Sequence, residues 1–390
     1  MKIVHVINSL AMSTGGPAPA CRDMARAMAR RGHHVSIHTT ARRPTEDGPA
    51  IGRLVDADGV HIICHPMVPP RFFGTSPAMA RALDPVVADA DIVHVHSLYL
   101  FHDWLAGRLC RRHATPYVLM PHGSLDPYHF GHHRRRKRLI EWAFQNRVTA
   151  GAARLQFTTE DERQRSAPQT RGAPAAIVPN GLVLADFHDL PPAGAFRQLY
   201  PVLGRDPYVL FLGRLAEKKG LDILTEAMAR LMPDRPTLRL VVVGADDGIG
   251  VAARRWAEAA GIAKRTLFTG PLLGAAKLAA FRDAALFALP SAAENFGIAA
   301  VEALACGTPV VLSDQVNIAT EIAAAGAGLC VPRTPTDFAA ALAALLDDGA
   351  FRDRLAVAGP GLVAARYSAD AAAAELERVY RQILEPSCAS

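Results

Sequence analysis

The stretch LFALPSAAENFGIAAVEALACGTPVVLSD, residues 286–314, predicts a strand, a loop, a helix and a second strand. The runs LFAL and PVVL are short and continuously apolar, as expected for strands that are buried on both faces of a parallel sheet. The loop AAENFG leads to the helical run IAAVEALA, so strand, helix and strand follow one another as in a doubly wound sheet. The stretch therefore predicts an α/β fold with a parallel sheet.

The same alternation fills both halves of the chain. In the first half the strands KIVHVI, HVSIHTT, DIVHVHS, YVLMPHG and ARLQFTT alternate with helices, one of them predicted over 134–150. The pattern restarts at YVLFLGRL after a Pro- and Gly-rich stretch, which reads as a linker. We predict two Rossmann-like domains whose sheets face each other across a cleft, where ligands of such folds bind. The predicted bounds are 1–182 and 207–369, with a linker over 183–206.

Composition places the chain among globular proteins of the cytoplasm. Of its 390 residues, 50% are hydrophobic and 21% are charged, which excludes extensive disorder. Its six cysteines are scattered without a Cys-x-x-Cys pair, which favours reduced thiols over disulfides or a zinc site. The start MKIVHVINSL lacks the features of a secretory leader, and no apolar run approaches the roughly 20 residues of a membrane-spanning helix.

Charge differs between the two halves. Residues 1–181 carry a net charge of +9 and the remainder −3, with HHRRRKR at 132–138 as the densest cluster. This cluster is either a solvated helix start or a contact for an anionic membrane or acidic acceptor. No aromatic residues interleave with it, so a nucleic-acid partner is not expected. Membrane association would be peripheral, on the inner face of the cell membrane.

Two glycine-containing loops could hold an anion. STGGP at 13–17 follows the first strand, but it is neither a dinucleotide fingerprint nor a Walker loop. LGRLAEKKG at 212–220 places Arg214 and Lys219 after a buried strand, where two cations could clamp a diphosphate without metal. An ordinary basic loop between strand and helix is the alternative.

Two carboxylates lie eight positions apart in the stretch quoted first. Glu294 is in the loop before the helix, and Glu302 is within it. Carboxylates accept hydrogen bonds from hydroxyls, and the amides around Gly297 at the helix start favour phosphate or hydroxyl oxygens, so a polyhydroxylated ligand fits. Glu302 could instead be a solvated helix residue, but its surroundings are apolar and a charge there needs a partner.

These motifs resemble those of the retaining glycosyltransferases of family GT4, which have the GT-B fold. GRLAEKKG and PSAAENFGIAAVEALACGTPV resemble the two C-terminal signatures, the second being the Glu-x7-Glu motif of the family. STGGP, DIVHVHS, MPHGSLDPY, VPNGLVLADF and SDQVNIATEI extend the resemblance over almost the whole chain. The resemblance implies that the last helix, within residues 370–390, crosses back to the N-terminal, acceptor-binding domain. Residues 207–369 would bind the nucleotide sugar.

The resemblance also implies roles for individual residues. Arg214 and Lys219 would hold the nucleotide diphosphate, Glu302 the ribose, and Glu294 the hydroxyls of the donor sugar. Further donor-site positions are Gly15, Gly16, Gly244, Leu272, Asn295, Phe296, Gly297 and Ile298. His122 matches the active-site histidine near the reacting centre, and His96 is its candidate neighbour on the acceptor side.

The expected chemistry needs neither a metal nor a cofactor. Asp89 and Asp91 spell Asp-x-Asp, a metal signature in another glycosyltransferase fold, but they precede a strand and read as a turn. No placed carboxylate stands out as a nucleophile, so we expect front-face substitution. In it the leaving diphosphate accepts the proton of the acceptor hydroxyl, while Arg214 and Lys219 stabilise the charge.

The sequence thus predicts a retaining hexosyltransferase that uses a nucleotide diphosphate sugar, with UDP favoured over GDP by the resemblance. The expected acceptor is a glycan or lipid-linked glycan in bacterial exopolysaccharide, O-antigen or lipopolysaccharide synthesis. The alternatives are a GT-B epimerase or phosphorylase, which the paired signatures disfavour, and a non-catalytic nucleotide-sugar binding module. The nucleotide base would lie near TGPLL, residues 269–273, and would be recognised largely by backbone groups.

Overall fold

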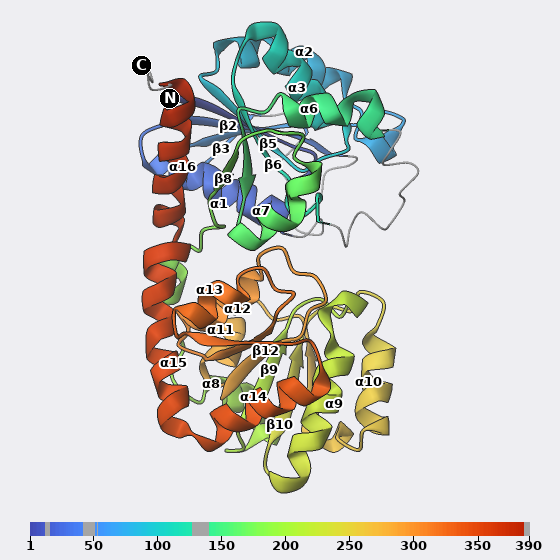
Figure 1. Ribbon diagram of the computed structural model, residues 1–390, viewed down its shortest axis with the longest axis vertical. Coiled ribbons are helices and arrows are strands. Elements are labelled where there is room, and N and C mark those ends of the chain that lie inside the picture. Colours follow the sequence, from blue (N-terminus) through green and yellow to red (C-terminus); the bar gives the residue numbers. More distant parts are fainter. Residues whose placement is uncertain (12–15, 42–50, 53, 127–139, 386–390) are drawn as a thin grey trace. The chain divides into compact units, whose positions relative to one another are not determined.

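The computed structural model describes residues 1–11, 16–41, 51–52, 54–126 and 140–385, and the basic cluster 132–138 lies outside them. The chain divides into two compact units (Figure 1). Unit 1 comprises Met1–Gly181 and Ala369–Ser390, and unit 2 comprises Leu182–Ser368. Each unit has a sheet with helices on both faces, as the alternating apolar runs predict.

Unit 1 is built on an eight-stranded sheet of order β3-β4-β2-β1-β5-β6-β7-β8. All neighbours are parallel except β3 and β4. The strands are β1 (Lys2–Ile7), β2 (His34–Ala41), β3 (Leu54–Ala57), β4 (Val60–Pro66), β5 (Ile92–His96), β6 (Tyr117–Met120), β7 (Arg154–Phe157) and β8 (Ala175–Ile177). The helices include α1 (Pro17–Arg30), α2 (Pro77–Asp89), α3 (Phe101–His113), α6 (Asn146–Ala150), α7 (Glu160–Ser166) and α16 (Ala369–Leu384).

The central strands of unit 1 are buried on both faces. Every residue of β5 and of β6 is buried, which is why these strands read as continuous runs rather than as alternating patterns. The antiparallel β3–β4 pair was not among the predicted strands. Its edge strand LVDA alternates exposed and half-buried residues, so it has no apolar run to mark it.

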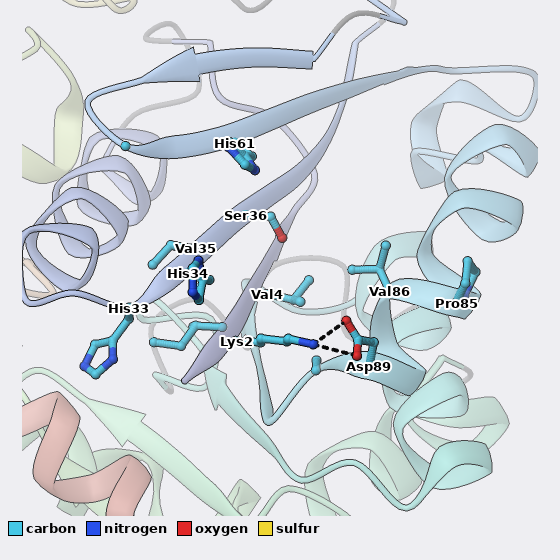
Figure 2. Close-up of a pocket in the computed structure, with 13 residues that line it drawn as sticks. Lys2, Val4, His33, His34, Val35, Ser36, His61, Pro85, Val86 and Asp89 are labelled. Carbon is cyan, nitrogen blue, oxygen red and sulfur yellow. Dashed lines mark hydrogen bonds and ion pairs between the residues drawn. The ribbon is translucent and has the colours of Figure 1, made fainter.

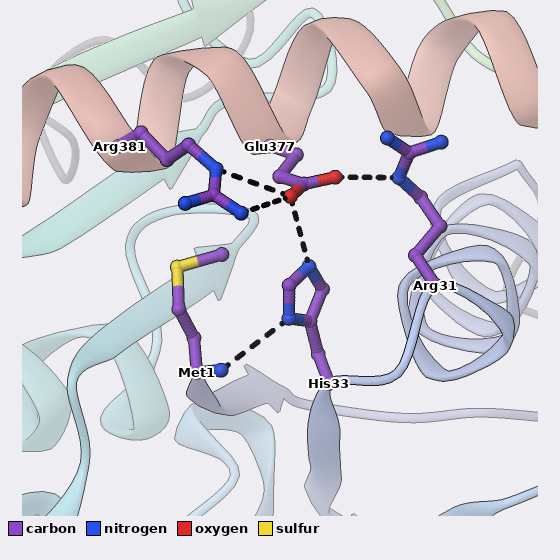
Figure 3. A network of polar contacts seen from close by, with 5 residues as sticks. All are labelled: Met1, Arg31, His33, Glu377 and Arg381. Carbon is purple, nitrogen blue, oxygen red and sulfur yellow. Dashed lines mark hydrogen bonds and ion pairs between the residues drawn. The ribbon is translucent and has the colours of Figure 1, made fainter.

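Helix α16 packs on α1 within unit 1, so the C-terminal helix returns to the N-terminal fold (Figure 1). Glu377 is the polar centre of this contact (Figure 3). Its carboxylate accepts hydrogen bonds from Arg31 Nε at 2.6 Å and from Arg381 Nη2 at 2.7 Å. His33 Nε2 lies 3.6 Å from the same carboxylate, and His33 Nδ1 lies 3.3 Å from the amine of Met1. The hydrogen bonds from Arg381 and Arg31 lower the pKa of Glu377 to about 2.

We expect Glu377→Gln to lower the free energy of unfolding by about 1–2 kcal/mol at neutral pH, because a charge-assisted contact between α16 and α1 is lost. The folded pKa lies below the ordinary value of 4.5, so the contribution is present above that value and is lost as pH falls towards 2. Denaturant unfolding should show the difference between wild type and variant narrowing from pH 7 to pH 3. Glu375→Gln is the control, since Glu375 pairs with Arg378 on the same helix. If Glu377→Gln and Glu375→Gln lower the free energy of unfolding equally, the expectation is contradicted.

Unit 2 is built on a six-stranded, fully parallel sheet of order β11-β10-β9-β12-β13-β14. The strands are β9 (Tyr208–Leu212), β10 (Arg239–Val243), β11 (Thr266–Gly270), β12 (Leu286–Leu289), β13 (Val310–Ser313) and β14 (Gly328–Val331). The helices include α9 (Leu221–Leu231), α10 (Gly250–Ala259), α11 (Gly274–Arg282), α12 (Ile298–Ala305), α13 (Ala319–Ala324), α14 (Pro335–Asp347) and α15 (Gly349–Leu362). The order β12–α12–β13 reproduces the strand, helix and strand predicted over 286–314.

Residues 183–206, predicted as a linker, contain the short helix α8 (Ala195–Leu199) and belong to unit 2. Phe196 and Leu203 are fully buried in the core of that unit. Asp283 fixes the start of α8 by accepting hydrogen bonds from the amides of Gly194 and Phe196. A stretch without strand pattern therefore packs as part of the folded unit.

A cavity of about 380 Å³ opens at the amino ends of β1 and β2 in unit 1 (Figure 2). Lys2 at its edge is paired with Asp89 at 2.8 Å. Because ligands of parallel α/β sheets bind outside the carboxyl ends of the strands, this cavity lies at the wrong end of the sheet for the predicted site. No helix among the described residues is both long and apolar enough to cross a membrane.

Candidate active site

The two predicted loops of unit 2 meet because they leave neighbouring strands at the same edge of the sheet. One loop follows β9 and carries Arg214 and Lys219, and the other follows β12 and carries Glu294. The amide of Ala292 donates to the carbonyl of Lys218 at 2.7 Å, which joins the loops directly. Gly220 is required there, since its φ is +71° and a Cβ would lie 2.0 Å from the carbonyl oxygen of Pro290.

Lys219 and Glu294 form an ion pair where the loops meet. Their side chains are only 14% and 17% exposed, so Lys219 is largely buried although it lies in a loop. Ser291 Oγ lies 3.5 Å from the same carboxylate, and burial lowers the pKa of the neighbouring Lys218. The arrangement concentrates a cation, a carboxylate and a hydroxyl at the carboxyl end of the sheet.

The segment before α12 is held in a fixed shape by the segment after β13. The amide of Glu294 donates to the carbonyl of Gln315, and the amide of Asn317 donates back to the carbonyl of Glu294. Asn317 Nδ2 donates to the carbonyl of Asn295 at 3.2 Å. Gly297 precedes α12 with a φ of +82°, and a Cβ added at this position would lie 3.1 Å from the Val316 side chain. The amide of Ala300 donates to the carbonyl of Gly297, while the amides of a helix's first turn have no intrahelical acceptor and are potential donors to an anion.

The side chains of the predicted donor residues around Gly297 divide between core and surface. Phe296 is buried and makes an edge contact with Tyr367, so only its backbone is available to a ligand. Ile298, the first residue of α12, is 42% exposed. Leu272 is partly buried and packs on the core.

Glu302 has the partner that its apolar surroundings demand. Lys277 of α11 donates to its carboxylate at 2.8 Å, and the Glu302 side chain is 14% exposed. Arg214 is likewise paired, with Asp247 at 2.7 Å, but both of these side chains are about half exposed. Sequence reasoning missed Lys277 and Asp247. The apolar sequence around Glu302 indicates that its charge needs a partner, but it does not indicate that this partner is on another helix.

A pocket of about 240 Å³ lies beside these loops and is lined by Gly244, Arg254, Phe268, Gly270 and Pro271, among others. The guanidinium of Arg254 stacks on the Phe268 ring at 4.5 Å. Gly244 has a φ of +157°, and a Cβ there would lie 1.8 Å from the carbonyl oxygen of Gly213. The pocket overlaps the start of TGPLL, near which the nucleotide base is predicted to lie.

Unit 1 brings its two predicted histidines together. His96 ends β5, and His122 follows the adjacent strand β6. His96 Nδ1 and His122 Nε2 are 3.0 Å apart, and burial lowers the pKa of His122 to about 3. Gly16 precedes α1 with a φ of −54° and no atom within 4 Å of an added Cβ, so local packing does not demand glycine there. Gly15 lies outside the described residues.

Comparison with known proteins gives one consistent picture. Residues 196–362 match the family model "Glycosyl transferases group 1", and residues 15–181 match "Glycosyl transferase 4-like domain". The chain is 31% identical to the D-inositol 3-phosphate glycosyltransferase of Stackebrandtia nassauensis, over 93% of this chain and 85% of the relative. It is 32% identical to the phosphatidyl-myo-inositol mannosyltransferase of Mycobacterium leprae, over 58% of this chain and 59% of the relative.

Solved structures show the same fold. Sucrose-phosphate synthase from Thermosynechococcus elongatus superposes with a TM-score of 0.79 at 23% identity, covering 99% of this chain and 100% of that one. Anabaena HepE, solved with UDP and glucose, has a TM-score of 0.75 at 18% identity, covering 97% of this chain and 99% of that one. The two parallel-sheet α/β units, with the last helix returning to the first, confirm the predicted GT-B fold.

Proposed function

The chain is a GT-B protein of the GT4 type and belongs to the group 1 glycosyltransferases, and from this premise we propose that it moves a hexose from a nucleoside diphosphate sugar to an acceptor hydroxyl with retention of anomeric configuration. The observation that carries the proposal is the meeting of Lys219 and Glu294 between the loops after β9 and β12. Charge of both signs, beside the N-terminus of α12, suits a ligand that is both anionic and polyhydroxylated.

Each charged group then has a distinct role. Arg214 and Lys219 hold the diphosphate, Glu302 accepts from the ribose hydroxyls, and Glu294 with the amides of residues 295–298 holds the sugar. The base enters the 240 Å³ pocket near Gly244 and Gly270, and UDP is proposed over GDP. These charges pair with Asp247, Glu294 and Lys277, and the donor would exchange those partners for its own groups.

The reaction is front-face substitution. The bond from the anomeric carbon to the diphosphate breaks, and the acceptor oxygen bonds to that carbon on the same face. The leaving diphosphate takes the acceptor proton, and Arg214 and Lys219 stabilise its developing charge, so no metal ion is proposed. We propose that His122 acts at the reacting centre.

The acceptor is proposed to be anionic, because residues 1–181 carry a net charge of +9. Lipid-linked glycans of bacterial surface polysaccharides meet this condition, and so do phosphorylated inositols. The printed names of two relatives refer to inositol 3-phosphate and phosphatidyl-myo-inositol, which favours testing inositol acceptors first. An acceptor in a lipid would place the protein at the inner face of the cell membrane, where Trp142, 81% exposed, could insert at the lipid surface.

Release of nucleoside diphosphate tests the proposal. The whole protein is incubated with UDP-glucose, UDP-galactose, UDP-N-acetylglucosamine or GDP-mannose, each with and without inositol 3-phosphate, phosphatidylinositol vesicles or a lipid-linked glycan. We expect one donor to give release that rises several-fold with one acceptor. Interconversion of donors without release would indicate an epimerase, and release dependent on inorganic phosphate a phosphorylase. If a nucleotide sugar binds but no combination of donor and acceptor is turned over, the protein would be a nucleotide-sugar binding module.

A further inference from the structure

Buried imidazoles lie side by side across the centre of the unit 1 sheet. His5 is on β1, His96 ends β5, and His122 follows β6, so three adjacent strands contribute rings to this row. His94 of β5 also stacks on His5 and His96, but its Nδ1 lies 2.6 Å from the hydroxyl of Tyr380 and it is not hydrogen-bonded within the row. His5 and His96 are fully buried, and His122 is partly exposed. Their rings stack in sequence, with centroids 5.2 Å apart between His5 and His96 and 5.3 Å apart between His96 and His122.

His96 uses both of its ring nitrogens within this row. His96 Nε2 lies 2.9 Å from His5 Nδ1, and His96 Nδ1 lies 3.0 Å from His122 Nε2. Burial lowers the pKa of His5 and of His122 to about 3, and lowers that of His96 well below its ordinary value. All three rings are therefore neutral at physiological pH, and each carries one N–H and one bare nitrogen.

Two proton arrangements satisfy both contacts. Either His5 donates to His96 and His96 donates to His122, or both bonds run in the opposite direction. The three rings must change together, because His96 cannot donate from both nitrogens while it is neutral. In the first arrangement the proton of His122 is on Nδ1, and in the second it is on Nε2.

The far end of the row decides between the two arrangements. His5 Nε2 is buried and has no hydrogen-bond partner among the described residues. In the first arrangement this atom is a bare nitrogen, and in the second it is an N–H without an acceptor, which is the rarer condition in folded proteins. We propose that His5 and His96 are positioning residues that fix His122 in the tautomer with its proton on Nδ1.

This inference rests on the proposed function, in which His122 lies at the reacting centre. His122 would then offer an N–H to an oxygen of the substrate, as a donor that stabilises developing negative charge, and could not accept a proton at that nitrogen. The backbone of this turn is held as well. Glu162 accepts a hydrogen bond from the amide of Gly123 at 3.1 Å, beside His122 with its φ of +50°.

A metal ion is the competing arrangement for the same residues. His5, Cys21 and His96 each offer a ligand atom within 4.8 Å of the others. A metal bound by His5 Nδ1 and His96 Nε2 would replace the proton between them. Burial raises the pKa of Cys21, which keeps its thiol protonated and disfavours the thiolate that a metal would require.

Nitrogen NMR of the whole protein, with histidine labelled by ¹⁵N, tests the inference, because protonated and bare ring nitrogens have different chemical shifts. We expect His122 with a bare Nε2 and a protonated Nδ1 in the wild type. His96→Phe should mix the two His122 tautomers, because His122 Nε2 then loses its hydrogen-bond donor, and should lower kcat about 10-fold with little change in donor KM. The matched control is His38→Phe, because His38 Nδ1 and His65 Nε2 make a similar buried contact at 3.1 Å on β2 and β4. It should leave the His122 signals unchanged.

A wild-type spectrum with the proton of His122 on Nε2 would overturn the inference, as would one equivalent of metal per chain by elemental analysis. The wild-type spectrum decides even if His96→Phe does not fold. His122→Ala separates this inference from the proposed function. Normal turnover in that variant would show that His122 does not act at the reacting centre, whereas the NMR spectrum reports only on the protons of the three imidazoles.

Discussion

Replacing Arg214 or Lys219 by alanine is expected to lower turnover by about 10²–10³-fold, as loss of one charge-stabilising donor does in other enzymes. Both cations follow β9, and in the proposed reaction they stabilise the leaving diphosphate. Lys219→Ala should be the more damaging change, because it also leaves the largely buried Glu294 without its ion-pair partner. Steady-state kinetics with the donor found in the panel would measure both variants.

Arg230→Ala is the matched control, because Arg230 pairs with Glu226 on the surface of α9 in the same unit. It should retain the wild-type rate. Circular dichroism and thermal unfolding of all three variants would separate lost chemistry from lost folding. Near-normal rates in both Arg214→Ala and Lys219→Ala would show that these residues do not stabilise the leaving diphosphate.

Replacing Glu302 or Glu294 by glutamine should affect different steps. Glu302→Gln is expected to weaken both the free nucleoside diphosphate and the whole donor by about 10–100-fold, because both ligands carry the ribose and a charge-assisted hydrogen bond is lost. Glu294→Gln should leave nucleoside diphosphate affinity nearly unchanged. It should instead lower turnover or change the preference between donors that differ at one sugar hydroxyl.

Calorimetry with the nucleoside diphosphate, together with kinetics for two or three donors, would measure these effects. The two variants are well matched, because each one removes the charged partner of a single lysine. Glu302→Gln does so for Lys277, and Glu294→Gln does so for Lys219. Equal losses of nucleotide affinity in the two variants would mean that ribose and sugar have been assigned to the wrong carboxylates.

The sequence was most informative where apolar runs are continuous. LFAL is strand β12, VVLS is strand β13 within one residue of the predicted run PVVL, and IAAVEALA is helix α12 with Glu302 inside it. Burial on both faces leaves an unbroken hydrophobic signal in such strands. The same reasoning missed the β3–β4 pair, whose residues alternate. It also read 183–206 as a linker, although Phe196 and Leu203 are core residues of unit 2.

Charge partners could not be predicted, because they depend on which strands are neighbours. Lys219 and Glu294 are 75 positions apart, and they meet only because β9 lies beside β12. The contacts of His96 likewise depend on the order β1-β5-β6 and on its register, which no local pattern encodes. Residue types at loop ends were predictable from the sequence, and their pairing was not.

Retention of anomeric configuration is the most direct test of the account. The whole protein, UDP-glucose and the acceptor that stimulates release would be followed by proton NMR, which reports the configuration of the new glycosidic bond. The account predicts that UDP and an α-linked glucoside appear together at equal rates, from a donor whose own linkage is α. A β-linked first product, or UDP formed only with free glucose at every acceptor concentration, would contradict it.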